Sequence, residues 1–306
     1  MSTYVVTGGA GFIGSHIAEA LVRGKHRVRI VDNFSSGKES NLEPFRSSVE
    51  VFQIDIASGA GLAEAFSGAD YVIHQAAIPS VPKSMLDPVT SNRANVDGTL
   101  NVLMAARDAK VKRLVYASSS SLYGDSPTLP KHEGMTPNPL SPYGAQKLFA
   151  EIYCQVFWKA YQFETVALRY FNVFGPRQDP KSPYSGVIAI FSTLMKQGKT
   201  PTIFGDGLQA RDFVHVSDVV QALRLAADSK KAVGRVYNIG TGRSVNLLEL
   251  VKHLNEILGT KITPIHQPPR AGDVRVSQAC IRRAREELGY EPAVSFRDGL
   301  AKTLGG

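Results

Sequence analysis

Cysteine is scarce in this chain of 306 residues, which has only Cys154 and Cys280, each isolated in a segment of helical periodicity. A disulfide framework needs cysteine pairs, and a thiolate metal site needs cysteines at short spacing. The seven histidines show no paired metal-ligand spacing either. We therefore expect no metal site, and we interpret both thiols as packing residues.

Long hydrophobic runs are missing too. No apolar stretch approaches the roughly 20 residues of a membrane span, and the chain does not open with a charged segment followed by a long apolar one. Apolar residues make up 43% of the sequence and charged residues 20%, as in ordinary globular proteins. We expect a cytoplasmic protein with no membrane partner.

The sequence also lacks the patterns of nucleic-acid-binding proteins. Its formal net charge is +8, but the basic residues are scattered, and no helix-turn-helix, zinc-finger or RNP pattern is present. The basic run 282–285 is followed by two glutamates, as on a solvated helix face. We expect no nucleic-acid partner, although the basic excess would attract an anionic substrate.

Short apolar runs alternate with segments of helical periodicity in the first half of the chain. This alternation predicts an α/β fold with a parallel sheet. The expected strands are residues 4–7, 28–31, 51–54, 71–74, 114–117 and 165–168, and the expected helices are residues 13–22, 95–109 and 143–161.

Prolines and glycines interrupt the alternation after about residue 169. A strand at 236–239 and helices at 245–258 and 278–288 follow. We expect a sheet domain over 1–169, to which 214–241 return, and a smaller substrate-binding domain built from 170–213 and 242–306.

A glycine-rich turn follows the first expected strand. Residues 8–14 read Gly-Gly-Ala-Gly-Phe-Ile-Gly, and the second strand leads to Asp32. Glycines let such a turn tighten and let the backbone approach a pyrophosphate at a helix N-terminus. A carboxylate after the second strand accepts from the adenosine ribose and repels a 2′-phosphate. Together they predict a Rossmann-type, doubly wound sheet that binds NAD in preference to NADP.

Polar and small residues follow two further strands. Asp55 either accepts from the adenine amino group or serves as a turn carboxylate, and the residues alone favour neither. Gln75, Ala76 and Ala77 are placed to line a cofactor cleft at the carboxyl ends of the strands. We interpret His74, which precedes them, as a structural histidine.

Tyr143 and Lys147 point to alcohol redox chemistry. A tyrosine has an ordinary pKa of about 10, whereas a general base works best near the operating pH. A lysine four residues later lies on the same helix face, and its charge, with that of oxidised nicotinamide, favours the phenolate. This spacing alone is common in helices, but the serines at 118–121, directly after an expected strand, strengthen the prediction.

In their order along the chain these motifs resemble the extended short-chain dehydrogenases/reductases, and among them the UDP-hexose 4-epimerases. The resemblance is carried by residues 7–14, 32–33, 55–56, 95–99, 118–124, 143–147, 169–175 and 211–215. It implies a redox-neutral reaction in which Tyr143 takes the proton of the sugar 4-hydroxyl, hydride passes to NAD, and the 4-keto sugar turns over before hydride returns. Ser119 would hydrogen-bond the reacting oxygen, and Lys147 would hold the nicotinamide ribose.

The resemblance also implies which residues bind cofactor and substrate. The residues implied for NAD are Gly8, Gly11, Phe12, Ile13, Gly14, Asp32, Asn33, Ser35, Gly37, Asp55, Ile56, Gln75, Ala76, Ala77, Asn95, Tyr143, Lys147 and Phe171. The residues implied for the UDP-sugar are Ser80, Ser119, Ser120, Tyr143, Asn172, Arg211, Arg270, Asp273 and Ser277. Asn172 and Arg211 would hold the diphosphate, and Arg270 and Asp273 the phosphate and ribose, since a guanidinium fork matches phosphate oxygens.

Three serines bear on the reaction and on the sugar. Related dehydratases carry Asp-Glu at the positions of Ser120 and Ser121, and nucleotide-sugar decarboxylases usually carry Glu at the second. Serine cannot replace a carboxylic acid at neutral pH, so dehydration is disfavoured. Ser277 falls where these epimerases set the size of the sugar pocket, and a small residue there would admit a 2-acetamido group. It would also suit the cap of a helix beginning at 278.

The segments 79–82 and 178–180 look most like the epimerases that act on UDP-N-acetylglucosamine. The helices at 95–109 and 143–161 carry apolar positions beyond what one sheet face needs. In similar enzymes these helices form a four-helix dimer interface, so we expect a homodimer.

Two other functions stay open. A 4-ketosugar reductase would release its cofactor in each turnover, whereas an epimerase would keep NAD through purification. An NAD-binding module without catalysis is disfavoured by the intact Ser119, Tyr143 and Lys147.

Overall fold

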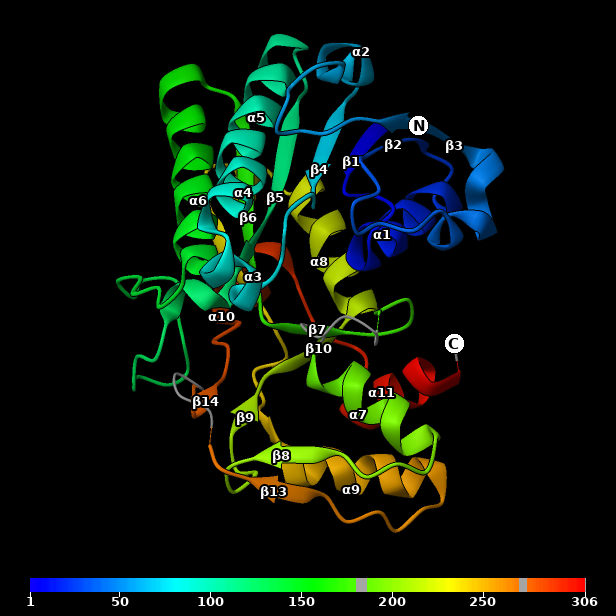
Figure 1. The fold of residues 1–306 in the computed structure, drawn as a ribbon. Helices are drawn as coiled ribbons and strands as arrows, with labels where there is room; N and C mark the ends of the chain where they lie inside the picture. The colour runs from blue at the N-terminus through cyan, green and yellow to red at the C-terminus, as the bar shows by residue number, and fades with distance from the viewer. Residues whose placement is uncertain (180–185, 270–273, 306) are drawn as a thin grey trace.

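The computed structural model describes residues 1–179, 186–269 and 274–305 and has a seven-stranded sheet at its centre (Figure 1). The sheet order is β11-β6-β5-β4-β1-β2-β3, and every neighbouring pair is parallel. Its strands are β1 (Thr3–Thr7), β2 (Arg27–Asp32), β3 (Val49–Gln53), β4 (Tyr71–His74), β5 (Arg113–Ser119), β6 (Glu164–Tyr170) and β11 (Val236–Ile239). The order reverses beside β1, so the sheet is doubly wound, and the predicted Rossmann-type fold is confirmed.

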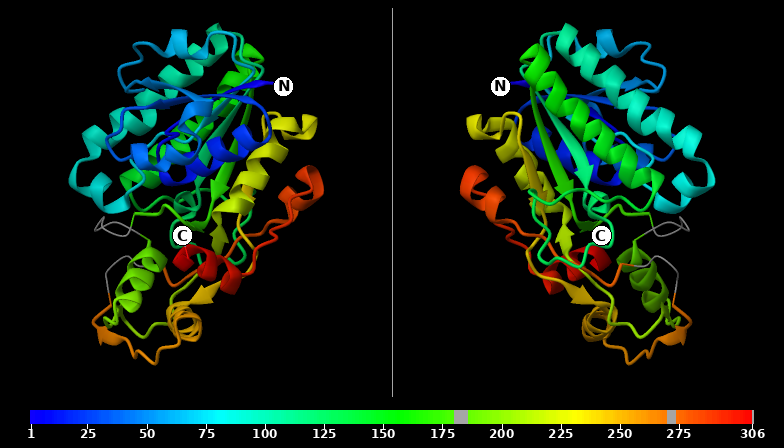
Figure 2. Two further views of the ribbon diagram at one scale, coloured as in Figure 1. Left: turned by 90° about the vertical axis from the view of Figure 1, so that its right-hand side faces the viewer. Right: turned by 90° about the vertical axis from the view of Figure 1, so that its left-hand side faces the viewer.

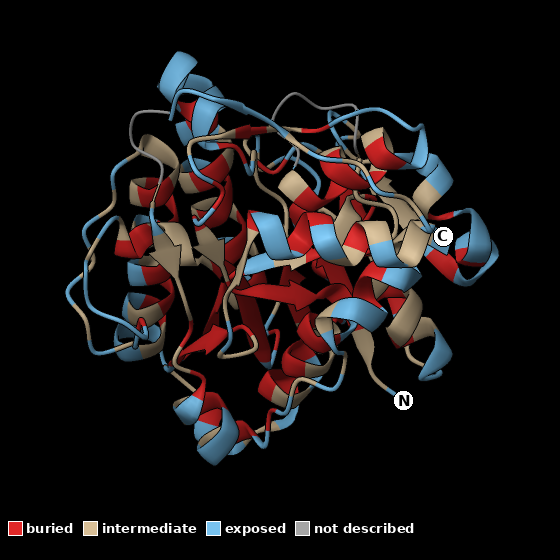
Figure 3. Cartoon of the chain, turned by 90° about the horizontal axis from the view of Figure 1, so that it is seen from below, coloured by how far each residue is buried: buried red, intermediate tan, exposed pale blue. Residues whose placement is uncertain are grey.

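These strands form because apolar side chains are buried on both of their faces. Val5 and Val6 are neighbours in β1 and both fully buried, but they pack against different helical layers. Successive strand residues point to opposite faces, so a strand covered on both sides needs a continuous apolar run. Figure 3 shows the result, with buried strands in the middle and exposed residues on the surrounding helices.

Two layers of helices cover the sheet. One face carries α1 (Phe12–Arg23), α8 (Val216–Asp228) and α10 (Arg282–Leu288), and the other carries α2 (Leu62–Phe66), α5 (Gly98–Asp108) and α6 (Pro142–Tyr161). In Figure 2, α8 (yellow) and α10 (orange) lie on the opposite side of the sheet from α5 (cyan). None of the helices in the described parts of the chain has the length and apolarity that a membrane crossing requires.

A smaller lobe lies below the sheet in Figure 1 and has its own apolar core. Its helices are α7 (Val187–Lys196), α9 (Leu247–Leu258) and α11 (Phe296–Gly305). Its strands are short: β7 (Asn172–Phe174) pairs with β10 (Phe213–His215), β8 (Thr202–Phe204) pairs with β13 (Ile265–Gln267), and β9 (Ala210–Arg211) lies between β12 (Val245–Asn246) and β14 (Val276–Ser277). The domain boundaries stay a prediction.

Short helical segments connect these elements. They are α3 (Val81–Leu86), α4 (Pro88–Asn92), a π-helical turn at Arg93–Asp97, and 3-10 turns at Glu39–Asn41, Glu43–Ser48, Ser120–Tyr123 and Lys230–Ala232. The predicted strands and the helices at 13–22 and 143–161 agree with the structure to within two residues at each end.

α10 starts later than the helix predicted at 278–288. The backbone before it pairs with a distant residue, since Lys131 N donates to Gln278 O at 2.8 Å and Cys280 N donates to Lys131 O at 2.7 Å. Backbone groups committed to this pairing cannot also close helical turns. The interpretation of Ser277 as a helix cap is therefore wrong, because Ser277 lies in β14.

Two other predicted helices begin differently from the prediction. The π-helical turn precedes α5 within the helix predicted at 95–109. In the helix predicted at 245–258, the first two residues pair with β9 as β12. α9 then starts from a capping box, in which Asn246 and Glu249 each accept from the other's backbone N–H.

Leu250 and Leu248 test the separate core of the smaller lobe. Both lie on α9, but Leu250 is fully buried whereas Leu248 is 39% exposed. Leu250→Ala leaves a cavity, so we expect the free energy of unfolding to fall by about 2–5 kcal/mol. Leu248→Ala changes the helix propensity equally and should cost less than about 1 kcal/mol. Urea unfolding measures both, and equal losses would contradict a packed core around Leu250.

Candidate active site

Consecutive residues at the end of β5 are bonded to residues spaced by four on α6. Ala117 O accepts from Lys147 Nζ at 2.8 Å, Ser118 Oγ donates to Glu151 Oε2 at 2.8 Å, and Ser119 forms a side-chain hydrogen bond with Tyr143. Residues four apart lie on one face of a helix, so Tyr143, Lys147 and Glu151 form one row of side chains that faces the strand. The structure thereby brings together the three residues predicted to be catalytic.

α6 begins where the sequence predicts. Ser141 Oγ accepts from Gly144 N at 3.2 Å as the N-cap, and a proline occupies the first turn. Tyr143 N, another donor of the first turn, is bonded to Ser84 Oγ at 3.0 Å. Ser84 lies on α3, so α3 fixes the backbone position of the tyrosine.

In the chain alone, burial dominates the electrostatics of Tyr143 and Lys147. Burial raises the pKa of Tyr143 to about 12, although the bond to Ser119 acts in the opposite direction. Burial also lowers the pKa of Lys147 to about 7. Both groups are driven toward their neutral forms because dehydration disfavours either charge. The expectation that Lys147 and oxidised nicotinamide together favour the phenolate concerns the protein with its cofactor bound, and it stays a prediction.

Ser119 is the last residue of β5, and Ser120 and Ser121 begin the 3-10 turn that follows this strand. Ser119 Oγ accepts from Ser121 N at 3.1 Å and caps this turn. Ser119 and Ser120 are half-buried. Ser121 Oγ is buried and has no hydrogen-bond partner among the described residues. The stretch therefore offers hydroxyl groups and no carboxylate to a ligand.

A buried ion pair beside this row was not predicted from the sequence. Arg169 Nη2 lies 2.6 Å from Glu151 Oε1, and both side chains are almost fully buried. Arg169 also donates to Tyr123 OH at 2.8 Å, and Tyr123 OH donates to Asn238 Oδ1 at 2.7 Å. The available signal was periodicity, since Glu151 falls on the same face of the predicted helix as Tyr143.

The glycine turn lies where β1, β2 and β4 end. Gly8 N donates to Val31 O at 2.7 Å, and Gly8 has a φ of +68°. A Cβ on Gly8 would lie 2.6 Å from Ala76 N, and a Cβ on Gly14 would lie 2.1 Å from Gly8 O, so only glycine fits at either position. Gly11, the N-cap of α1, leaves the first N–H groups of the helix without a side-chain partner. These donors suit the phosphates of a dinucleotide.

Asp32 is fixed against this turn. Its carboxylate is buried and accepts from two backbone N–H groups, each at 2.9 Å. Burial raises the pKa of Asp32, and the two N–H groups lower it. A Cβ on Gly37 would lie 2.8 Å from Asp32 Oδ1, so the loop that carries Asn33 and Ser35 closes tightly over the carboxylate. A negative charge in this place fits NAD and opposes a 2′-phosphate.

Two predicted cofactor residues are bonded within the protein. Asp55 Oδ1 accepts from Ala57 N at 2.9 Å, which is a turn role, and its adenine contact stays a prediction. Asn95 donates to Ile78 O at 3.2 Å and to Gln146 Oε1 at 2.8 Å, and it accepts from Ile78 N at 2.8 Å. Both amide hydrogens of Asn95 are therefore occupied, and its side chain holds the segment after β4 in place.

His74 is locked in one neutral tautomer. Thr99 Oγ1 donates to Asn95 O at 2.7 Å, so it accepts from His74 Nε2 at 2.9 Å, and His74 Nδ1 then accepts from Thr7 Oγ1 at 2.6 Å. Burial lowers the pKa of His74 to about 3. The structural interpretation of His74 is confirmed, and it anchors the predicted lining segment 75–77 that follows it.

Three predicted substrate residues meet on short strands at the junction of the two lobes. Arg211 in β9 pairs in register with Ser277 in β14. Asn172 begins β7, and Asn172 N donates to Asp212 O at 3.0 Å. The segments that carry these residues are thus bonded directly to the stretch 211–212.

Three further predicted site residues are buried, and two lie outside the described residues. Ser80 is buried and caps α3, since its Oγ accepts from Lys83 N at 3.2 Å. Ile56 and Phe171 are buried apolar residues. Arg270 and Asp273 lie outside the described residues. Within residues 1–179, 186–269 and 274–305, no group of three His, Cys, Asp or Glu side chains is placed to hold a metal ion.

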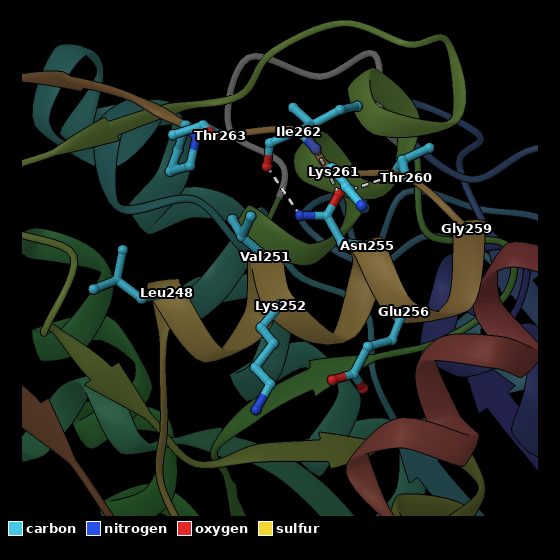
Figure 4. Close-up of a pocket in the computed structure, with 11 residues that line it drawn as sticks. Leu248, Val251, Lys252, Asn255, Glu256, Gly259, Thr260, Lys261, Ile262 and Thr263 are labelled. Carbon is cyan, nitrogen blue, oxygen red and sulfur yellow. Dashed lines mark hydrogen bonds between the residues drawn. The ribbon is translucent and has the colours of Figure 1, made fainter.

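A separate surface hollow of about 670 Å³ lies on α9 (Figure 4). Asn255 Oδ1 accepts from Thr260 Oγ1 at 2.7 Å and from Ile262 N at 2.9 Å, and Asn255 Nδ2 donates to Ile262 O at 2.9 Å. These polar groups are bonded to one another, and none of the predicted site residues lines the hollow. It is a feature of the smaller lobe outside the candidate site.

Known proteins resemble this chain over almost its whole length. The sequence model of the NAD dependent epimerase/dehydratase family matches residues 4–240. The UDP-glucose 4-epimerase of Mycolicibacterium smegmatis is 39% identical over 305 residues, covering 98% of this chain and 96% of that protein.

Solved structures also resemble this chain. The UDP-N-acetylglucosamine 4-epimerase from Methanobrevibacter ruminantium M1 has a TM-score of 0.95 at 38% identity, and the UDP-glucose 4-epimerase from Thermotoga maritima has 0.94 at 39%. Each comparison covers 99% of this chain and 97% of the solved one. The chain therefore belongs to the NAD dependent epimerase/dehydratase family, among its UDP-sugar enzymes, and its cofactor is NAD.

Proposed function

We propose that the protein catalyses NAD-dependent, redox-neutral 4-epimerisation of a UDP-hexose through a 4-keto intermediate. The proposed pairs are UDP-glucose with UDP-galactose, and UDP-N-acetylglucosamine with UDP-N-acetylgalactosamine. The observation that carries the proposal is the bonding of Tyr143 and Lys147 to the carboxyl end of β5, two strands from β1, whose carboxyl end leads into the glycine turn. Relatives named as 4-epimerases of UDP-glucose and of UDP-N-acetylglucosamine support it.

The glycine turn, the first turn of α1 and the loop around Asp32 would hold the cofactor. When bound, NAD supplies reversible acceptance and return of a hydride. The segment 75–77 would line its cleft, and Lys147 would hold the nicotinamide ribose. With a pKa of about 7, Lys147 is poised to gain or lose a proton near neutral pH.

Tyr143 would take the proton of the sugar 4-hydroxyl and return it after the keto sugar has turned. Its pKa of about 12 in the chain alone is too high for a base at neutral pH. Positive charge on Lys147 and on oxidised nicotinamide acts strongly on a phenolate in so dehydrated a setting. Ser119, bonded to Tyr143, would hold the reacting oxygen toward the base.

Rotation of the keto sugar requires a firmly held nucleotide and a loosely held sugar. Asn172 and Arg211 would bind the diphosphate, since a guanidinium matches phosphate oxygens. Arg270 and Asp273 are proposed for phosphate and ribose from the family resemblance alone. Ser277, in register with Arg211, would border the sugar.

The hydroxyls after β5 favour epimerisation over other reactions of the family. Relatives of the chain include a UDP-N-acetyl-alpha-D-glucosaminuronate decarboxylase and a UDP-glucuronate 4-epimerase. Water elimination across carbons 5 and 6 needs an acid and a base, and neither Ser120 nor Ser121 ionises at neutral pH. Decarboxylases usually carry Glu at the position of Ser121, so we propose a UDP-hexose that loses neither water nor a carboxylate.

Tyr143→Phe removes the proposed base and keeps the ring. We expect kcat for UDP-glucose to fall by about 10³-fold, while NAD stays bound because the glycine turn is intact. Tyr153→Phe, at a half-buried tyrosine on the same helix, is the matched control and should keep its activity. NMR of the 4-epimers, with purified protein and no added cofactor, measures turnover. Unchanged turnover in Tyr143→Phe would refute the base, and a need for stoichiometric added cofactor in the wild type would favour a 4-ketosugar reductase.

Ser277→Tyr tests the proposed admission of a 2-acetamido group. A tyrosine beside the sugar would fill the space that this group needs, so we expect turnover of UDP-N-acetylglucosamine to fall by about tenfold or more, as for a lost substrate contact. Turnover of UDP-glucose should change much less, and Ser277→Ala should keep both activities. If Ser277→Tyr slowed both sugars equally, Ser277 would not border the acetamido group.

We also propose a homodimer through α5 and α6. Their outer faces carry exposed apolar side chains at Met104, Phe149, Ile152, Val156 and Tyr161. Three of these are spaced as one face of α6, and a contiguous apolar face in water marks an interface. Ile152→Glu should shift the protein to monomers in sedimentation velocity, because a carboxylate would be buried at the contact. Leu248→Glu, at an exposed leucine of α9, is the control, and an unshifted Ile152→Glu would contradict this interface.

A further inference from the structure

Asp212 is a fully buried carboxylate held by four hydrogen bonds. It lies between β9 and β10 and is 0% exposed. Its Oδ1 accepts from Thr241 N at 2.7 Å and from Thr241 Oγ1 at 2.8 Å, and its Oδ2 accepts from Gly242 N at 2.9 Å and from Ala279 N at 3.1 Å. Burial raises the pKa of Asp212, and these four bonds lower it. Three of the four partners are backbone N–H groups, which can only donate, so these bonds favour the ionised carboxylate.

The backbone of Asp212 joins the same region together. Asp212 N donates to Ser277 O at 2.8 Å, and Asn172 N donates to Asp212 O at 3.0 Å. Arg211 precedes it in the chain. The three residues proposed to contact the nucleotide-sugar, Asn172, Arg211 and Ser277, are therefore each a direct backbone neighbour of this one aspartate.

The loop after β11 packs closely on the carboxylate. A Cβ on Gly240 would lie 3.0 Å from Asp212 Oδ2 and 2.8 Å from Ala279 Cβ. The loop after β11, which carries Gly240 and Thr241, thus packs tightly on the segment after β14. A buried carboxylate that loses one of its donors keeps the full cost of its dehydration, so the bonds hold these segments in a single arrangement.

We propose that Asp212 is a positioning residue for the nucleotide-sugar. Its carboxylate fixes β9, β14 and the loop after β11 to one another, so that Arg211, Asn172 and Ser277 face one substrate. This inference rests on the proposed function, because it takes those three residues as substrate contacts.

Asp212→Asn tests the inference with a side chain of the same shape. The amide turns one acceptor into a donor that faces other donors, either at Thr241 or at Gly242 and Ala279. We expect the affinity for UDP, measured by titration calorimetry, to fall by about tenfold or more. The KM for UDP-glucose should rise by a similar factor, while kcat changes by less than about threefold. The bound NAD content should be unchanged, since within the described residues Asp212 forms no hydrogen bond to a residue proposed for NAD.

Asp218→Asn is the matched control. Asp218 is also buried, also has a pKa raised by burial, and accepts from Ala293 N at 3.0 Å and Val294 N at 3.4 Å. None of these partners is a proposed substrate residue. We expect Asp218→Asn to lose a comparable free energy of unfolding and to keep its UDP affinity. An unchanged UDP affinity in Asp212→Asn, or an equal loss in both variants, would overturn the positioning role.

A milder variant keeps the test decisive if Asp212→Asn does not fold. Thr241→Ala removes one of the four bonds and should weaken UDP binding by about threefold with NAD retained. No change in its UDP affinity would overturn the proposal. A wild type that binds UDP but does not epimerise would refute the proposed function and leave Asp212 to be decided by the UDP titration. A wild type that binds no UDP would refute both.

Discussion

The docking of α6 on the end of β5 is the interaction on which the rest of the site depends. Residues 117–119 end an inner strand that is buried on both faces, so the sheet sets their positions. Tyr143, Lys147 and Glu151 stand one helical turn apart and reach three successive strand residues. The strand fixes the positions of residues 117–119, and the helix places their partners one turn apart. The reacting groups are therefore held by the rigid sheet, although they lie at the carboxyl ends of its strands.

This docking buries two charged residues, Glu151 and Lys147, in different surroundings. Glu151 is buried but paired with Arg169, and a buried charge is tolerable only with such a partner and further hydrogen bonds. Within the described residues, Lys147 donates a hydrogen bond only to a backbone carbonyl, and dehydration lowers its pKa to about 7. Lys147 is thus the member of the row whose charge responds to what else occupies the site. The protonation state of Tyr143 therefore depends on the cofactor and the substrate as well as on the protein.

The sequence predicts those parts of the molecule that local patterns determine. Alternation of apolar runs gives the sheet strands and the helices at 13–22 and 143–161, and the glycine turn with Asp32 gives the cofactor. The prediction fails where a segment pairs with a distant part of the chain. The helix predicted from 278 is an example, because the backbone of 278–280 is hydrogen-bonded to Lys131 before α10 begins. Glu151 and Asp212 were missed for the same reason, because their partners come from other strands and loops. The direction of the Tyr143 pKa depends on burial, which no spacing reveals.

The row on β5 and α6 has a consequence for how the chain tolerates changes in length. One inserted residue in β5 after Ala117, or in α6 between Tyr143 and Glu151, would turn side chains to the wrong side and break several bonds of the row at once. The connection from 124 to 140 carries none of these bonds, and much of it is exposed. Within that connection, Lys131 is held by its backbone pairing with Gln278 and Cys280, so a change of length is least disruptive in the exposed stretch before it. A change of length there would leave the bonds between β5 and α6 in place.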